Sequence, residues 1–381
     1  MGIVVRDASG SIVRDDAGNE HIDLLAGIGV LATGHRHPRV VEAIEQQLAR
    51  YLHVMVYGEF VQEPQVRLAE KLVRLLPAGL DTVYFTNSGA EAVEGALKLC
   101  RRATGRSGLV AFKGGFHGDT LGAMSVGGNP FYRDPFLPLL PGVDFLDFND
   151  TGSLERVDEQ TAAVIVEPVQ AEAGVIPARK EFLCALAERC RQVGALLIFD
   201  EVITGFGRTG TLFAMERYGV VPDVVVLAKA LGGGLPLGAF VSRQEVMRHF
   251  ATNPPLGHVT TFGGHPLSCA AGLASLDVII AEDLPLRAER MGARLEQGLR
   301  EALRRTGLRA LRRAGLLIGI EMDSPGLVQR LVRECRKERL IVGWTLHDDT
   351  VVRLAPPLVI GEAQVDEALA RIERAARRAT A

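Results

Sequence analysis

The chain has 381 residues, of which 47% are hydrophobic and 23% charged, and its formal net charge at pH 7 is -3. This composition is that of a globular protein with room for a large domain and a smaller one. The charge balance creates no global positive field, so nucleic acid and anionic membranes are poor candidates as partners and small molecules are better ones.

The cysteines are odd in number and have no C-x-x-C spacing, which is typical of reduced thiols in the cytosol: Cys100, Cys184, Cys190, Cys269 and Cys335. The N-terminus has no apolar signal segment, and no later run reaches membrane-spanning length. We therefore expect a cytoplasmic protein that binds no membrane. We expect no metal site.

In chain order, the first predicted element is an amphipathic helix over residues 40–52. Short apolar runs then alternate with helical patterns, and they predict strands at residues 82–86, 109–112, 163–166, 195–199 and 224–227. Their hydrophobicity is nearly continuous rather than alternating, which favours a sheet covered on both faces. The prediction is an α/β large domain with a mostly parallel sheet flanked by helices.

The C-terminal part predicts a helix over residues 287–305, strands at 316–320 and 351–354, and a final helix that contains Val365, Leu369 and Ile372. Together with the N-terminal helix, these elements predict a smaller α+β domain built from both chain ends. The expected divisions are residues 1–50 for its N-terminal segment, 51–262 for the large domain and 263–381 for its C-terminal segment.

A predicted strand meets a predicted helix just before Ser88. Ser88 and Glu91 have the S-x-x-E spacing of a capping box, which predicts a helix from there to about Arg102. The free N–H groups and the positive end of such a helix suit a phosphate group. The alternative is an ordinary well-capped helix.

Asp200 follows directly on the predicted strand 195–199, at the edge where open α/β sheets bind their ligands. A carboxylate there could bind a protonated ring nitrogen and make the ring an electron sink. Val202 would lie on the same strand face and could press on that ring. Alternatively, Asp200 caps a loop or pairs with an arginine.

The segment Gly205-Phe206-Gly207-Arg208-Thr209-Gly210 matches G-x-G-x-x-G and raises a rival hypothesis, a nicotinamide-dependent oxidoreductase. The match is weak, because the first glycine of such a fingerprint belongs in the tight turn after the strand, and an acidic pair intervenes here. We interpret the segment as a flexible loop.

Lys229 ends the apolar run 224–228. Burial disfavours the charged amine, lowers its pKa and makes it available as a nucleophile towards an aldehyde. The alternative is a lysine that ends a core strand and extends its amine into water.

A phosphate site, a ring-nitrogen acid and a buried lysine at successive strand ends are what pyridoxal phosphate chemistry requires. The chain resembles the class III aminotransferases, which are pyridoxal phosphate enzymes of fold type I. The resemblance rests on Asp200 to Gly210 followed by Lys229, and on Ile22-Asp23-Leu24-Leu25-Ala26-Gly27, Gly34-His35-Arg36-His37-Pro38 and Arg353-Leu354-Ala355-Pro356-Pro357.

By that resemblance, Lys229 binds the cofactor as a Schiff base and then moves the proton, and Asp200 binds the pyridine nitrogen. The resemblance also implies that Ser88, Gly89 and Ala90 bind the phosphate group of the cofactor. Phe116 and Val202 would lie against the two faces of its ring, and His117 would be a further cofactor-binding residue. Without the resemblance, Phe116 would be an ordinary core aromatic residue.

The resemblance also implies a homodimer in which Thr261 of each subunit reaches the cofactor phosphate of its partner. Arg353 corresponds to the family arginine that binds the acceptor carboxylate, and Glu172 to a carboxylate that can pair with it and act as a switch. Taken alone, Thr261 is a loop hydroxyl and the pair is a structural salt bridge.

Three positions depart from the family pattern. Ile203 replaces a glutamine that contacts the cofactor hydroxyl, Asp119 replaces an arginine that binds a substrate carboxylate, and His265 replaces an asparagine. The reversed charge at Asp119 favours an amine-rich donor.

The sequence therefore predicts a cytoplasmic, homodimeric transaminase that uses pyridoxal 5'-phosphate in a ping-pong cycle. The expected donor is the ω-amino group of an ornithine-, acetylornithine- or 4-aminobutyrate-like amino acid or of a diamine, and the acceptor is a 2-oxo acid such as 2-oxoglutarate or pyruvate. The alternatives are an aminomutase of the glutamate-1-semialdehyde type, the NAD-dependent oxidoreductase and a catalytically silent binding protein.

Overall fold

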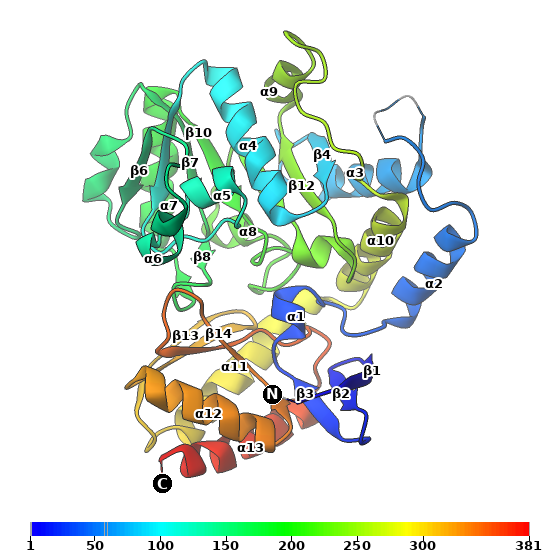
Figure 1. Cartoon of the computed structure of the whole chain (residues 1–381), viewed down its shortest axis with the longest axis vertical. Helices are drawn as coiled ribbons and strands as arrows, with labels where there is room; N and C mark the ends of the chain where they lie inside the picture. The colour runs from blue at the N-terminus through cyan, green and yellow to red at the C-terminus, as the bar shows by residue number, and fades with distance from the viewer. Residues whose placement is uncertain (1, 57, 59, 381) are drawn as a thin grey trace.

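The computed structural model describes residues 2–56, 58 and 60–380. Within them the chain forms two lobes (Figure 1), an upper one around a seven-stranded sheet and a lower one that contains both termini. No helix in these described residues is long and apolar enough to cross a membrane.

The upper sheet has the strand order β4-β12-β11-β10-β7-β5-β6. Its strands are β4 (Thr82–Thr86), β5 (Gly108–Phe112), β6 (Val143–Leu146), β7 (Thr161–Val166), β10 (Leu196–Asp200), β11 (Val224–Leu227) and β12 (Gly238–Ser242). The five strands predicted for this domain are confirmed to within two residues at each end, and so is the mostly parallel pairing. Strands β6 and β12 were not predicted, and β12 is antiparallel to both of its neighbours.

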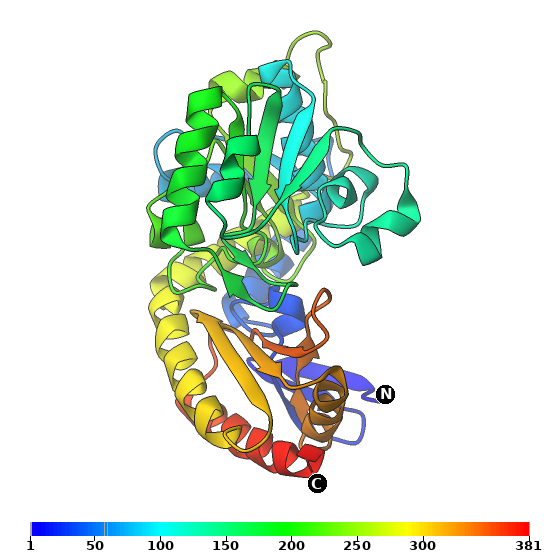
Figure 2. The ribbon, with the colours of Figure 1, turned by 90° about the vertical axis from the view of Figure 1, so that its left-hand side faces the viewer.

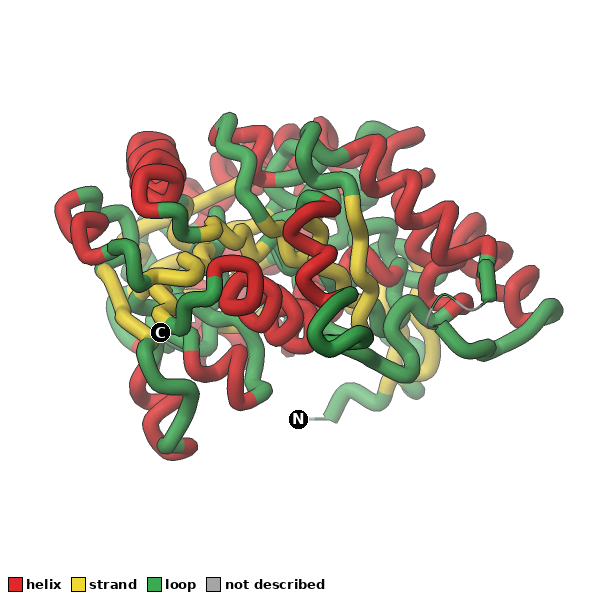
Figure 3. The backbone as a smooth tube through the Cα atoms, turned by 90° about the horizontal axis from the view of Figure 1, so that it is seen from above, coloured by secondary structure: helices red, strands yellow, loops and turns green. Residues whose placement is uncertain are grey.

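Both faces of this sheet are buried, as the continuous hydrophobicity predicts. Val225 and Leu227 of β11 belong to one hydrophobic cluster, and Val224 and Val226 to another. Successive side chains of a strand point to opposite faces, so the two clusters are the two sides of the sheet. Helix α4 (Gly89–Thr104) contributes to one cluster and α7 (Lys180–Val193) to the other. Figure 3 shows strands lying between helices.

Shorter elements surround the sheet, together with α3 (Glu63–Leu75). They are α5 (Leu121–Ser125), α6 (Pro130–Arg133), η1 (Asp134–Phe136), η2 (Gly152–Arg156), β8 (Val169–Gln170), β9 (Ile176–Pro177), α8 (Ala214–Tyr218), η3 (Lys229–Gly232), α9 (Gln244–Met247) and η4 (Arg248–Phe250).

The lower lobe combines the two chain ends, as predicted. One of its sheets has the order β1-β2-β3-β15 and the other the order β13-β14-β17-β16. The C-terminal strand β15 pairs in parallel with the N-terminal β3 through Leu340 and Ile22. The strands are β1 (Val5–Ser9), β2 (Ile12–Asp15), β3 (Glu20–Asp23), β13 (Leu308–Ala314), β14 (Leu317–Met322), β15 (Leu340–Ile341), β16 (Gly343–Trp344) and β17 (Val351–Leu354).

The helices of the lower lobe are α11 (Leu284–Ala302), α12 (Pro325–Lys337) and α13 (Glu362–Thr380). Figure 2 shows α11 and α13 along the outside of this lobe. The predicted helix at 287–305 corresponds to α11, which begins and ends three residues earlier.

Three further helices lie between the lobes or beside them: α1 (Ala26–Gly29), α2 (Pro38–Leu48) and α10 (Pro266–Ala281). Helix α2 begins and ends earlier than the predicted 40–52. Helix α10 packs against α2, α3 and η3. It was not predicted, because a helix that is apolar on several sides lacks an amphipathic period. The domain divisions after residues 50 and 262 stay predictions.

Candidate active site

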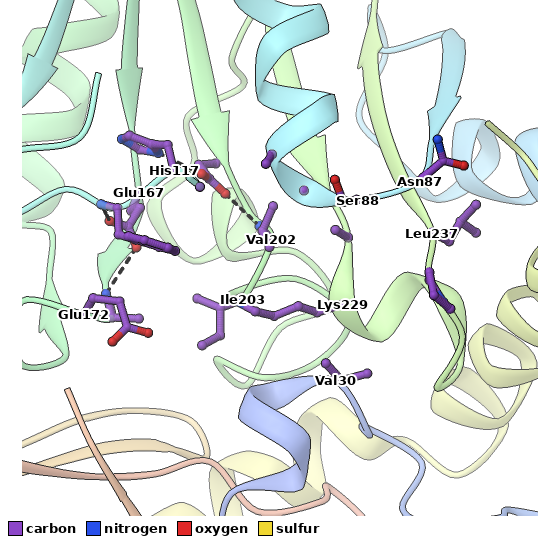
Figure 4. A pocket seen from close by; sticks show the side chains of 18 of the residues that line it. Val30, Asn87, Ser88, His117, Glu167, Glu172, Val202, Ile203, Lys229 and Leu237 are labelled. Atoms are coloured by element: carbon purple, nitrogen blue, oxygen red, sulfur yellow. Dashed lines mark hydrogen bonds and ion pairs between the residues drawn. The ribbon is translucent and has the colours of Figure 1, made fainter. Parts of the chain in front are cut away.

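A cavity of about 420 Å³ lies at the carboxyl ends of β10 and β11. Figure 4 shows Ser88, Val202, Ile203 and Lys229 around this space. Ligands of open α/β sheets bind at this edge, because the loops that follow the strands meet there. Among the predicted site residues, the cavity is lined by Ser88, Gly89, Ala90, Phe116, His117, Glu172, Asp200, Val202 and Lys229.

The start of α4 forms one wall of the cavity. Ser88 Oγ accepts a hydrogen bond from the Glu91 N–H at 3.2 Å, as in the predicted capping box. A capping box also predicts that the Glu91 carboxylate accepts a hydrogen bond from the Ser88 N–H. This part of the prediction is wrong, because the carboxylate accepts from the N–H and the side-chain amide of Asn87, both at 2.8 Å. The carboxylate thus stabilises the residue before the N-cap rather than Ser88 itself. A Cβ at Gly89 would lie 3.1 Å from Val202 Cγ2, so glycine permits this close approach.

Asp200 lies at the end of β10 and is buried. Its Oδ2 is 2.8 Å from His117 Nδ1, and its Oδ1 accepts a hydrogen bond from the Val202 N–H at 3.0 Å. Burial alone would lower the pKa of His117, but the hydrogen bond and the charge of Asp200 raise it above its usual value. The imidazole and the Val202 N–H thus hold both carboxylate oxygens of Asp200 in place, and an oriented carboxylate at this position suits a protonated ring nitrogen.

Lys229 follows β11 at the first position of η3 and has a positive φ of 47°. Non-glycine residues adopt this left-handed conformation at a cost, and such strain concentrates at functional sites. Burial lowers the pKa of the amine, while the charges of Asp200 and Glu172 act in the opposite direction. The structure thus brings to this lysine the desolvation that a nucleophilic amine needs.

Glu167 was overlooked as a site residue, although it lines the same cavity. Its Oε1 accepts from the Phe116 N–H at 3.0 Å and its Oε2 from the Ala171 N–H at 3.2 Å. Burial raises its pKa to about 7. Glu167 directly follows the apolar run 162–166, just as Asp200 follows the run 195–199. The same sequence signal could therefore have identified it.

Arg353 and Glu172 form an ion pair at the cavity, between the two lobes. Arg353 is on β17 and 4% exposed, and Glu172 lies between β8 and β9. The second carboxylate oxygen, Oε2, accepts from the Leu346 N–H at 2.9 Å. Among the residues that the structure describes, Arg353 Nε has no hydrogen-bond partner. The guanidinium therefore retains donor capacity.

Of four further positions singled out in the sequence, one lines the cavity and the other three do not. Ile203 is buried and lines the cavity, so an apolar side chain replaces the expected amide there. Thr261 and Asp119 are exposed and lie outside the lining of this cavity, and His265 stacks on His53 at 5.7 Å.

The glycine segment 205–210 is not the flexible loop that we expected. Its residues are mostly buried, and Arg208 donates hydrogen bonds to the carbonyls of Leu316 and Pro356 in the lower lobe. Burial lowers the pKa of Arg208 to about 9. The segment is a packed connection between the lobes, because its arginine satisfies backbone carbonyls that water cannot reach.

The donor set fits pyridoxal phosphate: a helix N-terminus suits a phosphate group, a buried carboxylate suits a pyridinium, and a desolvated amine suits an aldehyde. The fold and this set of groups define a pyridoxal phosphate enzyme of fold type I.

Comparison with known proteins agrees with that class. The family model of the class III aminotransferases matches residues 1–376. The acetylornithine aminotransferase of Methanopyrus kandleri is 45% identical over 97% of this chain and 92% of its own length. The putrescine aminotransferase of Pectobacterium atrosepticum is 41% identical over 95% of this chain and 80% of its own length. The ornithine aminotransferase of Toxoplasma gondii, in a structure with partial occupancy of PLP at its active site, superimposes with a TM-score of 0.92 at 32% identity, over 99% of this chain and 90% of that one.

The chain therefore belongs to the class III aminotransferase family. It is a pyridoxal phosphate-dependent transaminase, and the resemblance stated from its motifs is confirmed. The hypothesis of a nicotinamide-dependent oxidoreductase is wrong, since the family and the fold both differ from it.

Proposed function

We propose that this transaminase takes the terminal amino group of a diamine or ω-amino acid and transfers it to a 2-oxo acid such as 2-oxoglutarate or pyruvate. The observation that carries the proposal is the ion pair of Glu172 with Arg353 at the cavity. With Arg353 neutralised, the site suits a donor without a carboxylate next to its amine. With Glu172 displaced, the same arginine can bind the carboxylate of the acceptor.

In this proposal each cofactor contact belongs to a residue of the cavity. Ser88, Gly89 and Ala90 hold the phosphate group at the start of α4, and Asp200 binds the ring nitrogen with His117 behind it. Phe116 and Val202 lie against the ring faces. When bound, the cofactor supplies an aldehyde for Lys229 and a ring that withdraws electrons from the substrate carbon.

Lys229 would also carry the proton at the reacting carbon. The support is its place in the cavity and its lowered pKa, since a neutral amine can accept a proton.

Part of the cavity wall is apolar, which is evidence for a donor with an aliphatic chain. Val30, Phe116, Val202, Ile203, Leu235 and Leu237 are among the residues that line it. Asp119 is exposed and close enough to His347 to influence the pKa of that imidazole. A carboxylate there would attract a second ammonium group, so we favour putrescine-like and ornithine-like donors over acylated ones.

We also propose a homodimer in which Thr261 of each subunit contacts the cofactor phosphate of its partner. Thr261 is exposed, and Leu256, Val259 and Phe262 around it are exposed apolar side chains. Such a patch favours contact with another chain. A cytoplasmic location is part of the proposal, and the five free cysteines, four of them buried, support it.

The test is the visible absorption spectrum of the purified, cofactor-loaded protein during titration with single donors in the absence of an acceptor. Putrescine, ornithine, acetylornithine, 4-aminobutyrate and β-alanine would be compared with L-alanine, which has only an α-amino group. We expect one ω-amine to bleach the visible absorption band of the bound cofactor, and 2-oxoglutarate or pyruvate to restore that band. Bleaching by α-amino acids alone would contradict the proposed donor class.

A further inference from the structure

The loop between β16 and β17 lies over Glu172 and is braced by its own side chains. Thr345 Oγ1 donates to the Asp348 carbonyl at 2.6 Å, and the Thr350 N–H and hydroxyl donate to Asp348 Oδ1 at 2.9 and 2.6 Å. These bonds fix the conformation of residues 345–350, which precede Arg353 on the chain. The loop can therefore act as a rigid support.

The loop holds Glu172 through two backbone groups. The Leu346 N–H donates to the carboxylate at 2.9 Å, and the His347 N–H donates to the Glu172 carbonyl at 2.9 Å. The carboxylate is bound to Arg353 through Oε1 and to Leu346 through Oε2. It can leave the arginine freely only if the bond to the loop is also lost or the loop shifts.

Two side chains fasten this loop to the upper lobe. The Tyr132 hydroxyl, on α6, donates to the Leu346 carbonyl at 2.9 Å, and the Tyr132 ring stacks on His347 with centroids 5.5 Å apart. His347 Nδ1 donates to the Gly114 carbonyl at 3.0 Å, and its ring meets Phe116 edge-on at 5.9 Å. The support of Glu172 is thus connected directly to the segment that contains Phe116.

We propose that Tyr132 and His347 are positioning residues that hold Glu172 on Arg353 through the backbone of residues 346 and 347. They thereby set how readily Arg353 binds a carboxylate, and hence the preference for ω-amines over α-amino acids. This inference rests on the proposed role of Arg353. Each contact that keeps the loop in place raises the cost of displacing Glu172, and each contact removed lowers it.

The test measures glutarate, a dicarboxylate without an amino or oxo group, binding to the cofactor-loaded protein by calorimetry. Tyr132→Phe removes only the hydroxyl, and His347→Gln removes the stacked ring. Loss of one such hydrogen bond should tighten glutarate binding by about threefold to tenfold. In a Glu172→Gln background the same substitutions should have no further effect, because coupling is confined to residues that act through each other. Phe136→Leu, an exposed change in the same segment, is the matched control and should leave the affinity unchanged.

If Tyr132 and His347 only stabilised the fold, their substitution would weaken glutarate binding. A gain in affinity therefore distinguishes the proposed positioning role from a structural one. Weaker or unchanged glutarate binding in Tyr132→Phe, or an equal gain in the Glu172→Gln background, would overturn the inference. As a second measurement, L-alanine should bleach the cofactor band of Tyr132→Phe faster, relative to putrescine, than that of the unmodified protein. If no amine bleaches the unmodified protein, the proposed donor class fails, while the glutarate titration still tests the hold on Glu172.

Discussion

His117 Nδ1 lies 2.8 Å from Asp200 Oδ2, and both side chains are buried at the carboxyl edge of the large sheet. The pair unites a loop residue with the end of a core strand across 83 positions of sequence. The hydrogen bond and the charge of Asp200 raise the pKa of His117 against the effect of burial, so the two groups stabilise each other. A buried polar pair of this kind is stable because each partner satisfies the other's hydrogen bonding.

Replacing Asp200 with asparagine should reduce turnover by about 10²–10³-fold, since it removes a preorganised charge from the reacting ring. The substitution should also lower the pKa of His117, because burial remains while the anionic partner is lost. Steady-state kinetics and an NMR titration of the histidine measure the two effects. Asp147→Asn, which breaks a surface ion pair with Lys113, is the control, and an equal loss of turnover in both variants would contradict the assigned role.

Replacing Lys229 with alanine should give a folded protein that binds the cofactor without a covalent bond and has lost turnover. The physical reason is the loss of the desolvated amine that the cavity provides. Borohydride reduction followed by mass spectrometry tests for the covalent adduct. Lys180→Ala, at the exposed start of α7, should leave the adduct intact. Turnover of Lys229→Ala near the unmodified rate would exclude the assignment.

Replacing Arg353 with lysine keeps the charge but removes the planar fork that binds a carboxylate through two hydrogen bonds. We expect the half-reaction with the 2-oxo acid to slow by about tenfold to a hundredfold, which is the loss of one or two charge-assisted hydrogen bonds. The half-reaction with an ω-amine should change much less. Stopped-flow spectra of the two half-reactions give the comparison, and equal slowing of both would be evidence against a carboxylate-binding role.

Glu201 provides a test of how the free energy of unfolding depends on pH. It is fully buried, and burial raises its pKa to about 7, although Ala214, Met215 and Thr204 donate hydrogen bonds to it. The folded state thus binds this proton more tightly than the unfolded state. The resulting stability is complete below about pH 4.5 and is lost as the pH rises through about 7.

Between pH 5 and pH 8 the free energy of unfolding of the unmodified protein should therefore fall more than that of Glu201→Gln, by as much as about 3 kcal/mol. Urea denaturation at several pH values measures both proteins. Glu188→Gln, an exposed change on α7, is the control. Parallel pH profiles for the unmodified protein and Glu201→Gln would show that Glu201 does not carry this titration.

Gly95 in α4 and Gly326 in α12 form a matched pair for a test of packing. A Cβ at Gly95 would lie 2.3 Å from Phe240 Cε1, whereas one at Gly326 would meet only Arg330 Nη1 at 3.6 Å. Gly95→Ala should destabilise the fold by about 1–3 kcal/mol because the core is overpacked. Gly326→Ala should be neutral or stabilise it by up to about 1 kcal/mol through helix propensity. Thermal and urea unfolding measure both, and stabilisation by Gly95→Ala would contradict the packing described here.

Much of the large lobe could be predicted because its signals are local. The run Val224 to Leu227 is apolar throughout, and the structure buries it on both faces of the sheet. Strand β12 was missed, since nothing within Gly238 to Ser242 indicates that it is inserted antiparallel between β4 and β11. The N-cap of α4 was predictable from Ser88, but the partner of Glu91 was not, because it depends on how the chain enters the helix.

The sequence by itself determined that Asp200 and Lys229 follow core strands and made them candidates for the site, because a polar group at the end of an apolar run is visible within a few residues. Only the tertiary structure decided which groups meet across the two lobes. Glu172 and Arg353 are 181 residues apart, and the Leu346 N–H that completes their contact is a backbone group with no sequence signal. Such contacts depend on the relative placement of the two lobes, which is set by the summed packing of many residues and by no local period.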